Sequence, residues 1–238
     1  MLPALDNLIA LQALDTAADA ARRRLGELPA AEEAIAARAA DAEAALEAVK
    51  ARLAENNEKR RALEKDVAGV DTRLARFDAH KAAVKTNQEY TALLHEIAGA
   101  KAEKDAVEEQ ILVLLEAADG LTADLKAAAA AVAEARSEGE TARAALGSER
   151  QALETELSRL AAERTTQAAG VDARHLATYE QLLKGRRGIA VARLAGETCT
   201  ACHVRLRPHV AQMVRRNDTI VQCESCQRIL FFVAPQQA

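Results

Sequence analysis

The sequence contains no tryptophan, and only five of its 238 residues are aromatic; glycine and proline are also scarce, at ten and four residues. A single compact globule of this size needs large side chains to fill its interior, and this chain has too few of them. Alanine supplies most of the apolar half of the composition, and 29% of the residues are charged. Such a composition is typical of long helices. The sequence therefore predicts a mainly α-helical protein rather than one deep globular core.

Long apolar runs are missing as well. No stretch approaches the roughly 20 apolar residues that a helix needs to cross a bilayer. Asp6 and Asp15 interrupt the apolar stretch at the N-terminus, which is unlike a signal peptide. We therefore expect a soluble, cytoplasmic protein that does not use a membrane.

Charge is distributed unevenly along the chain. Residues 171–238 contain ten basic and five acidic residues, whereas residues 1–170 contain 22 basic and 31 acidic residues. All four cysteines lie in the basic part. Two regions of opposite sign indicate two different roles.

Residues 11–77 carry apolar residues at alternating spacings of three and four, from Leu11 to Phe77, with exceptions at Glu32, Asn56 and Arg60. A sustained period of 3.5 residues is typical of a left-handed coiled coil. A second series runs from Tyr90 to Ala135, and we expect it to slip phase after Gly139 and to resume at Leu146. Asn56 and Arg60 are interpreted either as a tolerated local weakness or as a register pin or flexible point.

A polar stretch, residues 78–89, separates the two series. If the chain reverses near residues 83–84, Phe77 faces Tyr90, Leu74 faces Leu93 and Val70 faces Ile97, with arms of similar length. We therefore predict an antiparallel coiled-coil hairpin over residues 1–170, with its tip near residues 82–87.

The four cysteines form two CxxC pairs, Cys199–Cys202 and Cys223–Cys226, separated by twenty residues. This spacing is typical of a tetrahedral four-thiolate zinc site, because each CxxC turn aims two sulfurs at one point. Four thiolates leave no open position for water, so the expected zinc, one per chain, is structural rather than catalytic. A redox or disulfide role is the alternative, and it fits a cytoplasmic chain without a βαβ pattern poorly. His203 follows Cys202 directly; it is a candidate substitute ligand, but we favour an exposed position or one outside the ligand set.

The rest of the basic region predicts a small α+β domain over residues 171–238. We expect a short amphipathic helix over 171–184, strand-like segments at 189–192, 220–222 and 229–233, and a second helix over 208–216. Only about 65 residues with three aromatics are available, so metal binding must supply much of the stability of this domain.

With these residues in view, the chain resembles a bacterial family of C4-type zinc-ribbon proteins with an N-terminal coiled-coil hairpin. Four segments carry the resemblance in order: residues 8–29, residues 85–97, Tyr179–Gly188, and the paired CxxC motifs ending at Leu230. The family usually places glycine inside the first CxxC and directly after the second, where this chain has Ala201 and Gln227. The resemblance implies a non-enzymatic adaptor, associated with nucleic acid or with regulatory protein partners.

The basic module suggests binding of RNA, DNA or another polyanion. Its net charge of five falls to about +3 once four thiolates and one Zn²⁺ are counted, which suffices for salt-sensitive phosphate contacts. A phosphorylated small ligand such as a nucleotide fits the same charges. The candidate residues are five arginines: Arg186, Arg187, Arg193, Arg205 and Arg207.

The alternative is a purely protein-binding adaptor with a regulatory or chaperone-like role, in which a partner grips the coiled coil or its tip. The candidate tip residues are Lys81, Lys85, Asn87, Gln88 and Glu89, for which simple turn chemistry is the competing interpretation. An enzyme is the least favoured class, because the sequence has no nucleophile elbow, phosphate-binding glycine loop or HExxH motif.

Overall fold

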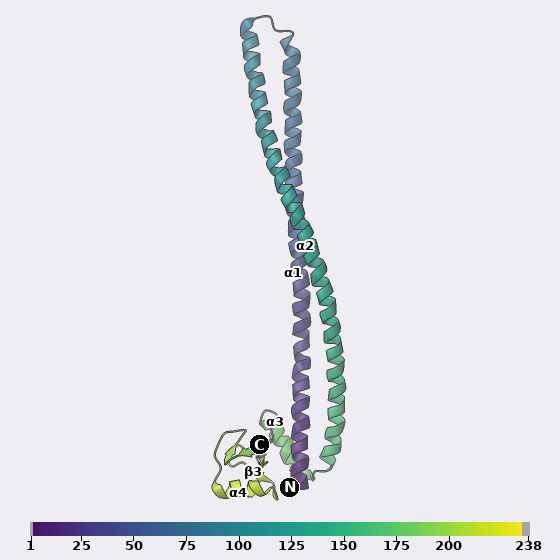
Figure 1. The fold of residues 1–238 in the computed structure, drawn as a ribbon, viewed down its shortest axis with the longest axis vertical. Coiled ribbons are helices and arrows are strands. Elements are labelled where there is room, and N and C mark those ends of the chain that lie inside the picture. The colour runs from purple at the N-terminus through teal and green to yellow at the C-terminus, as the bar shows by residue number, and fades with distance from the viewer. Residues whose placement is uncertain (1, 235–238) are drawn as a thin grey trace. The chain divides into compact units, whose positions relative to one another are not determined.

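The computed structural model describes residues 2–234. Two long helices, α1 (Pro3–Lys81) and α2 (Asn87–Ala169), run in opposite directions and are joined by residues 82–86 (Figure 1). The chain divides into two compact units: unit 1 comprises Met1–Glu32 and Ala144–Ala238, and unit 2 comprises Glu33–Arg143. The predicted class, a helical hairpin followed by a small α+β region, is confirmed. No helix in the described part of the chain has the length and apolar character required to cross a membrane.

The predicted seam of the hairpin is buried. Every position of the first series is buried or half-buried, and in the second series from Tyr90 to Ala135 only Tyr90 is exposed. The expected slip after Gly139 is wrong: Gly139 is itself buried, and Ala142 and Leu146, which follow at spacings of three and four, are half-buried. A Cβ placed at Gly139 would lie 3.2 Å from the Ile35 side chain. The seam therefore continues through Gly139, where a missing side chain lets the two helices approach closely.

The register of the hairpin differs from the expected one by about one heptad. In unit 2, the Lys104 ammonium lies 2.7 Å from the Asp71 carboxylate, and Arg73 pairs with Glu103. The expected pairing of Val70 with Ile97 would place Asp71 opposite residue 96 instead. A shift by seven residues leaves every seam residue on the seam, so the hydrophobic pattern alone does not distinguish the two registers.

The C-terminal part of unit 1 is a small α+β fold. It contains α3 (Ala173–Gly185) and α4 (Pro208–Arg216) and four short strands: β1 (Val191–Ala195), β2 (Thr198–Cys199), β3 (Val221–Gln222) and β4 (Ile229–Phe231). The strand order is β2-β1-β4-β3, with β1 and β4 parallel and the outer pairs antiparallel. The predicted helix over 208–216 coincides with α4.

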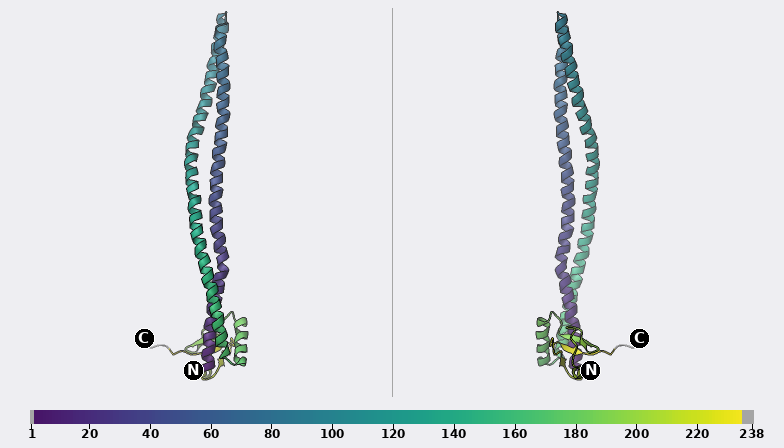
Figure 2. Two further views of the ribbon diagram at one scale, coloured as in Figure 1. Left: turned by 90° about the vertical axis from the view of Figure 1, so that its right-hand side faces the viewer. Right: turned by 90° about the vertical axis from the view of Figure 1, so that its left-hand side faces the viewer.

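The two faces of this sheet pack on different elements of unit 1. Ala192 and Leu194 point to one side, where they pack with α4 residues such as Val214 and with three of the cysteines. Val191 and Ile229 belong to a second cluster with Tyr179 of α3 and the N-terminal leucines of α1: Leu5, Leu8 and Leu11. Both views in Figure 2 show the start of α1 beside the small domain. Unit 1 therefore depends on both ends of the chain.

Candidate metal centre and basic surface

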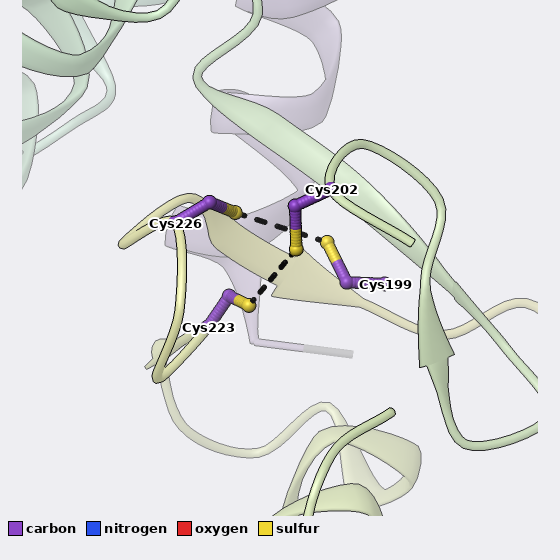
Figure 3. A group of neighbouring side chains, drawn as sticks. All are labelled: Cys199, Cys202, Cys223 and Cys226. Carbon is purple, nitrogen blue, oxygen red and sulfur yellow. Dashed lines mark hydrogen bonds between the residues drawn. The ribbon is translucent and has the colours of Figure 1, made fainter. Parts of the chain in front are cut away.

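Each CxxC pair forms a tight turn, which we call the first knuckle (residues 199–203) and the second knuckle (residues 223–227). The N–H of His203 donates to the Cys199 carbonyl at 2.9 Å, and the N–H of Gln227 donates to the Cys223 carbonyl at 2.8 Å. These equivalent hydrogen bonds turn both sulfurs of each knuckle toward one point, as Figure 3 shows.

The four sulfurs have the geometry of a zinc site. Cys199 Sγ lies 3.9 Å from Cys226 Sγ, Cys202 Sγ lies 3.7 Å from Cys223 Sγ, and all four lie within 4.8 Å of one another (Figure 3). Four sulfurs bound tetrahedrally at about 2.3 Å from one Zn²⁺ are about 3.8 Å apart, so the arrangement fits one ion. His203 is exposed and lies outside this cluster, as expected.

Burial and hydrogen bonding act differently on the four thiols. Burial raises the pKa of Cys199 to about 12 and also raises the pKa of Cys223. Burial acts in the same direction on Cys226, but hydrogen bonds from the backbone and side chain of Arg228 and from Cys202 and Cys223 together outweigh it and lower the pKa of Cys226 to about 7. A bound Zn²⁺ would hold all four sulfurs as thiolates, with no coordination position left for a substrate.

Arg228 connects the second knuckle to the turn after α3, a role that sequence reasoning missed. Its guanidinium donates to the Ile189 carbonyl at 2.8 Å and to the Arg186 carbonyl at 3.0 Å. In the sequence, Arg228 is recognisable only as an arginine two residues after the last cysteine, and nothing there distinguishes it from an ordinary surface arginine.

The knuckles contain two strained residues. His203 and Gln227 have φ values of +57° and +68°, in the left-handed region that favours glycine. Gln227 thus occupies a position where the resemblance expected glycine. Ala201, the other departure, has no positive φ, and the strained residue of the first knuckle is His203.

The five candidate arginines are not gathered in one cluster. Arg186 and Arg187 are exposed in the turn after α3, and Arg193 is exposed on β1. Arg205 forms an ion pair with Glu197 at 2.6 Å, and the Arg207 guanidinium lies 3.7 Å from Glu224. Within residues 2–234, no carboxylate lies within ion-pair distance of Arg186, Arg187 or Arg193. A ligand can therefore bind these three guanidiniums without displacing an acidic side chain.

Comparison with known proteins identifies the architecture. The family model described as a CT398-like coiled-coil hairpin domain matches residues 11–187, and that of a C4-type zinc-ribbon domain matches residues 198–230. The chain belongs to the CT398-like coiled-coil hairpin family. No curated protein matches the sequence.

Three solved structures share the fold of this CT398-like chain. CT398 from Chlamydia trachomatis is 23% identical, with a TM-score of 0.77 over 97% of this chain and 98% of that one. A Mycobacterium smegmatis protein is 20% identical, with a TM-score of 0.72 over 95% and 97%. The HP0958 protein from Helicobacter pylori is 14% identical, with a TM-score of 0.57 over 96% of both chains. At these identities the likeness concerns the fold alone.

At the tip of the CT398-like hairpin, two candidate residues take part in local structure. The Glu89 carboxylate accepts from the Thr86 N–H and the Thr86 hydroxyl accepts from the Glu89 N–H, both at 3.3 Å, which is a capping box that starts α2. Hydrogen bonds from the side chain and the backbone N–H of Thr86 to the carboxylate lower the pKa of Glu89. Lys81 pairs with Asp78 at 2.7 Å. The remaining tip candidates, Lys85, Asn87 and Gln88, are exposed.

Two polar residues on the inner face of α1 connect unit 1, and sequence reasoning did not assign them a role. Asp15, only 7% exposed, accepts from the Tyr179 hydroxyl and from Arg164 Nε, both at 2.7 Å. Gln12 accepts from the N–H groups of Ala190 and Val191 at 2.6 and 3.0 Å. The sequence offered one indication, polar residues next to the seam positions Leu11 and Leu14, but the partners of these polar residues lie about 150 or more residues away in the sequence.

Proposed function

We propose that this protein is a non-enzymatic adaptor whose basic C-terminal module binds RNA, DNA or another polyanion and whose coiled coil binds a protein partner. The observation that carries the proposal is the pair Arg186 and Arg187. Both are exposed, neither has a carboxylate within ion-pair distance in the described chain, and the turn that holds them is fixed by Arg228.

A fixed turn suits phosphate binding. The Gly188 N–H donates to the Leu183 carbonyl at 3.0 Å, and Gly188 has a φ of +78°, so the chain leaves α3 in a defined direction. Two guanidiniums on such a support lose less freedom on binding than they would on a mobile loop. Arg193 adds a third available charge, whereas Arg205 and Arg207 must first leave their acidic partners.

The decisive experiment is binding of the zinc-loaded chain to labelled RNA and duplex DNA over a salt series. We expect micromolar or tighter binding at low salt that weakens as salt rises. Arg186→Ala/Arg187→Ala should weaken binding to every sequence and reduce the salt slope by roughly two. Arg205→Ala/Arg207→Ala removes the same charge and is the matched control, for which we expect a smaller effect because both arginines are ion-paired.

Binding no tighter than millimolar at low salt would exclude the nucleic-acid part of the proposal. Binding of a nucleoside triphosphate at low concentration, without binding of the polymer, would indicate a phosphorylated small ligand instead. Equal effects of the two double variants would show that the turn after α3 has no special role.

A purely protein-binding adaptor is the second candidate, favoured by exposed apolar side chains on unit 2. Leu112 and Val113 are 61% and 60% exposed, and Tyr90 and Leu94 near the tip are 44% and 42% exposed. Exposed aliphatic and aromatic groups on a charged helix are typical of protein contacts. Partner binding that is independent of salt and is lost in Leu112→Ser/Val113→Ser or Tyr90→Ser/Leu94→Ser would favour this candidate.

A further inference from the structure

An open groove of about 650 Å³ lies between α1 and the ribbon, entirely within unit 1. Its α1 wall consists of one large apolar residue, two polar residues and three alanines: Ile9, Gln12, Thr16, Ala13, Ala17 and Ala20. Its ribbon wall comes from the β1 segment, β4 and the first knuckle: Ile189, Val191, Ala192, Arg193, Thr200, Ala201 and Phe231. We call this feature the α1–ribbon groove.

The groove remains open because Gln12 fixes the spacing of its two walls and the α1 wall carries short side chains. Gln12 binds the ribbon wall to α1 by accepting from Ala190 and Val191 and by donating to the Gly188 carbonyl at 2.8 Å. Ala13, Ala17 and Ala20 are exposed and have no side chain long enough to fill the space.

The ribbon wall presents unfilled apolar surface. Ile189 remains 43% exposed, although it lies beside the core residue Val191, which is 5% exposed. A partner that covers Ile189 and the half-buried Phe231 would remove this apolar surface from water, which favours binding.

The charge of the groove determines which sign of charge a bound ligand must carry. Arg193 is the one charged residue among the described residues that line the groove, and no described carboxylate lies within ion-pair distance of it. Arg23, exposed, follows Ala20 by three residues on the same side of α1. Asp19 lies near the Gly188 turn but is bound by Arg22 at 2.8 Å. An occupant therefore needs apolar groups together with at least one negative charge.

The length of the groove favours a peptide over a small anion. Ile9 and Ala20 are eleven residues apart on α1, or about 16 Å at ~1.5 Å per residue. About five residues of extended chain span the same distance. A single phosphate or small carboxylate would contact Arg193 but leave most of the apolar wall in water.

We propose that the α1–ribbon groove binds a short extended segment of a partner protein, in which apolar side chains cover Ile189 and Phe231 and an aspartate or glutamate pairs with Arg193. This proposal goes beyond the pair Arg186 and Arg187 after α3, since it concerns an apolar groove and a peptide ligand; Arg193 is the residue that the two surfaces share. It adds protein recognition to the face of β1 that carries Arg193.

The test is a selection of random heptapeptides displayed on phage against the zinc-loaded full chain, with prior depletion on Ala17→Trp, which fills the groove. Synthetic peptides from the selection are then titrated by fluorescence anisotropy. We expect sequences that combine apolar residues with aspartate or glutamate, and we expect Arg193→Gln to weaken their binding about tenfold or more.

Arg187→Gln is the matched control, because it removes one exposed arginine outside the groove and should leave peptide binding unchanged. Zinc content and helical circular dichroism establish that each variant is folded. The proposal is overturned if no peptide survives depletion, if the selected peptides lack acidic residues, or if Arg193→Gln binds them as well as wild type. Nucleic-acid binding by the same variants is measured separately, so failure of the proposed function leaves the peptide result interpretable.

Discussion

At the scale of single residues, the metal centre combines four well-placed sulfurs with two strained backbone positions. His203 and Gln227 follow the second cysteine of each knuckle, and both adopt positive φ. For a residue with a Cβ this conformation costs roughly 1–2 kcal/mol. The hydrogen bonds that close each knuckle hold the strain in place.

Gln227→Gly should therefore stabilise the zinc-loaded ribbon by up to about 1 kcal/mol, because relief of strain exceeds the added entropy of the unfolded chain. Ala201→Gly is the matched control: Ala201 has no positive φ, so glycine there should destabilise the ribbon slightly. Chemical unfolding of the zinc-loaded proteins measures both changes. An equal loss of stability in the two variants would contradict the claim that the positive φ of Gln227 destabilises the ribbon.

The buried carboxylate of Asp15 is the second important feature at this scale. It joins α1 to α2 through Arg164 and to α3 through Tyr179. Burial, together with the hydrogen bond to Asp15, raises the pKa of Tyr179 above its ordinary value. Because its pKa is higher in the folded protein, Tyr179 contributes to the free energy of unfolding fully at pH values below about 10, its pKa in the unfolded chain. This contribution is lost as the pH rises toward the pKa in the folded protein.

Tyr179→Phe should lower the free energy of unfolding at neutral pH by about 2 kcal/mol, since it removes a buried hydrogen bond to a charged group. It should also remove the decline in stability that the tyrosine causes above pH 10. Denaturant unfolding at pH 7 and at several values above 10 measures both effects. Parallel pH profiles for wild type and variant would rule out the titration of Tyr179 as the cause.

At the scale of the helices, the weak point of the seam is the pair Asn56 and Arg60. Asn56 is 8% exposed, and neither its Oδ1 nor Arg60 Nε has a hydrogen-bond partner in the described structure. An unsatisfied buried polar group costs about 1–3 kcal/mol. Unit 2 therefore carries a local instability within a mostly apolar seam.

Asn56→Leu should stabilise unit 2 by roughly 1–2 kcal/mol, because it replaces an unsatisfied polar group with apolar surface. Glu58→Leu, at an exposed position two residues away, is the control and should change stability little. Thermal unfolding followed by circular dichroism gives the comparison. A less stable Asn56→Leu protein would instead support a role of Asn56 in fixing the register.

At the scale of the whole molecule, the zinc site supports one of several separate cores. Three cysteines belong to the cluster with α4, whereas the α1 leucines and Tyr179 form a second cluster. Glu33–Arg143 forms a compact unit that contains none of the cysteines. Loss of the metal should therefore reduce the order of the zinc-binding region and leave the helices of Glu33–Arg143 folded.

Chelation of zinc should increase amide exchange about tenfold or more over residues 191–233, because the knuckles lose the interaction that orders them. Residues 40–140 should keep their protection, and far-ultraviolet dichroism should change little, since α1 and α2 contain 79 and 83 of the 238 residues. Hydrogen exchange with mass spectrometry measures this, with Cys226→Ser as the metal-free control. Loss of protection in the middle of α1 would contradict the independence of unit 2 from the zinc site.

The sequence by itself determined the helical hairpin and the zinc ligands. Both depend on local spacing: a 3.5-residue apolar repeat buries one stripe of a helix, and a CxxC turn converges two sulfurs whatever surrounds it. The helix over 208–216 and the strands around the second knuckle followed from the same local rules.

Tertiary structure alone decided the features that depend on distant partners. The heptad repeat is compatible with a shift of seven residues, so the register is seen only in contacts between the two helices, such as the ion pair of Asp71 with Lys104. Gly139 entered the seam because Ile35 of the opposite helix fills the space that a side chain would need. Gln12 and Asp15 acquired their roles only when the two ends of the chain met, since a buried polar group is explained by its partners and not by its neighbours in sequence.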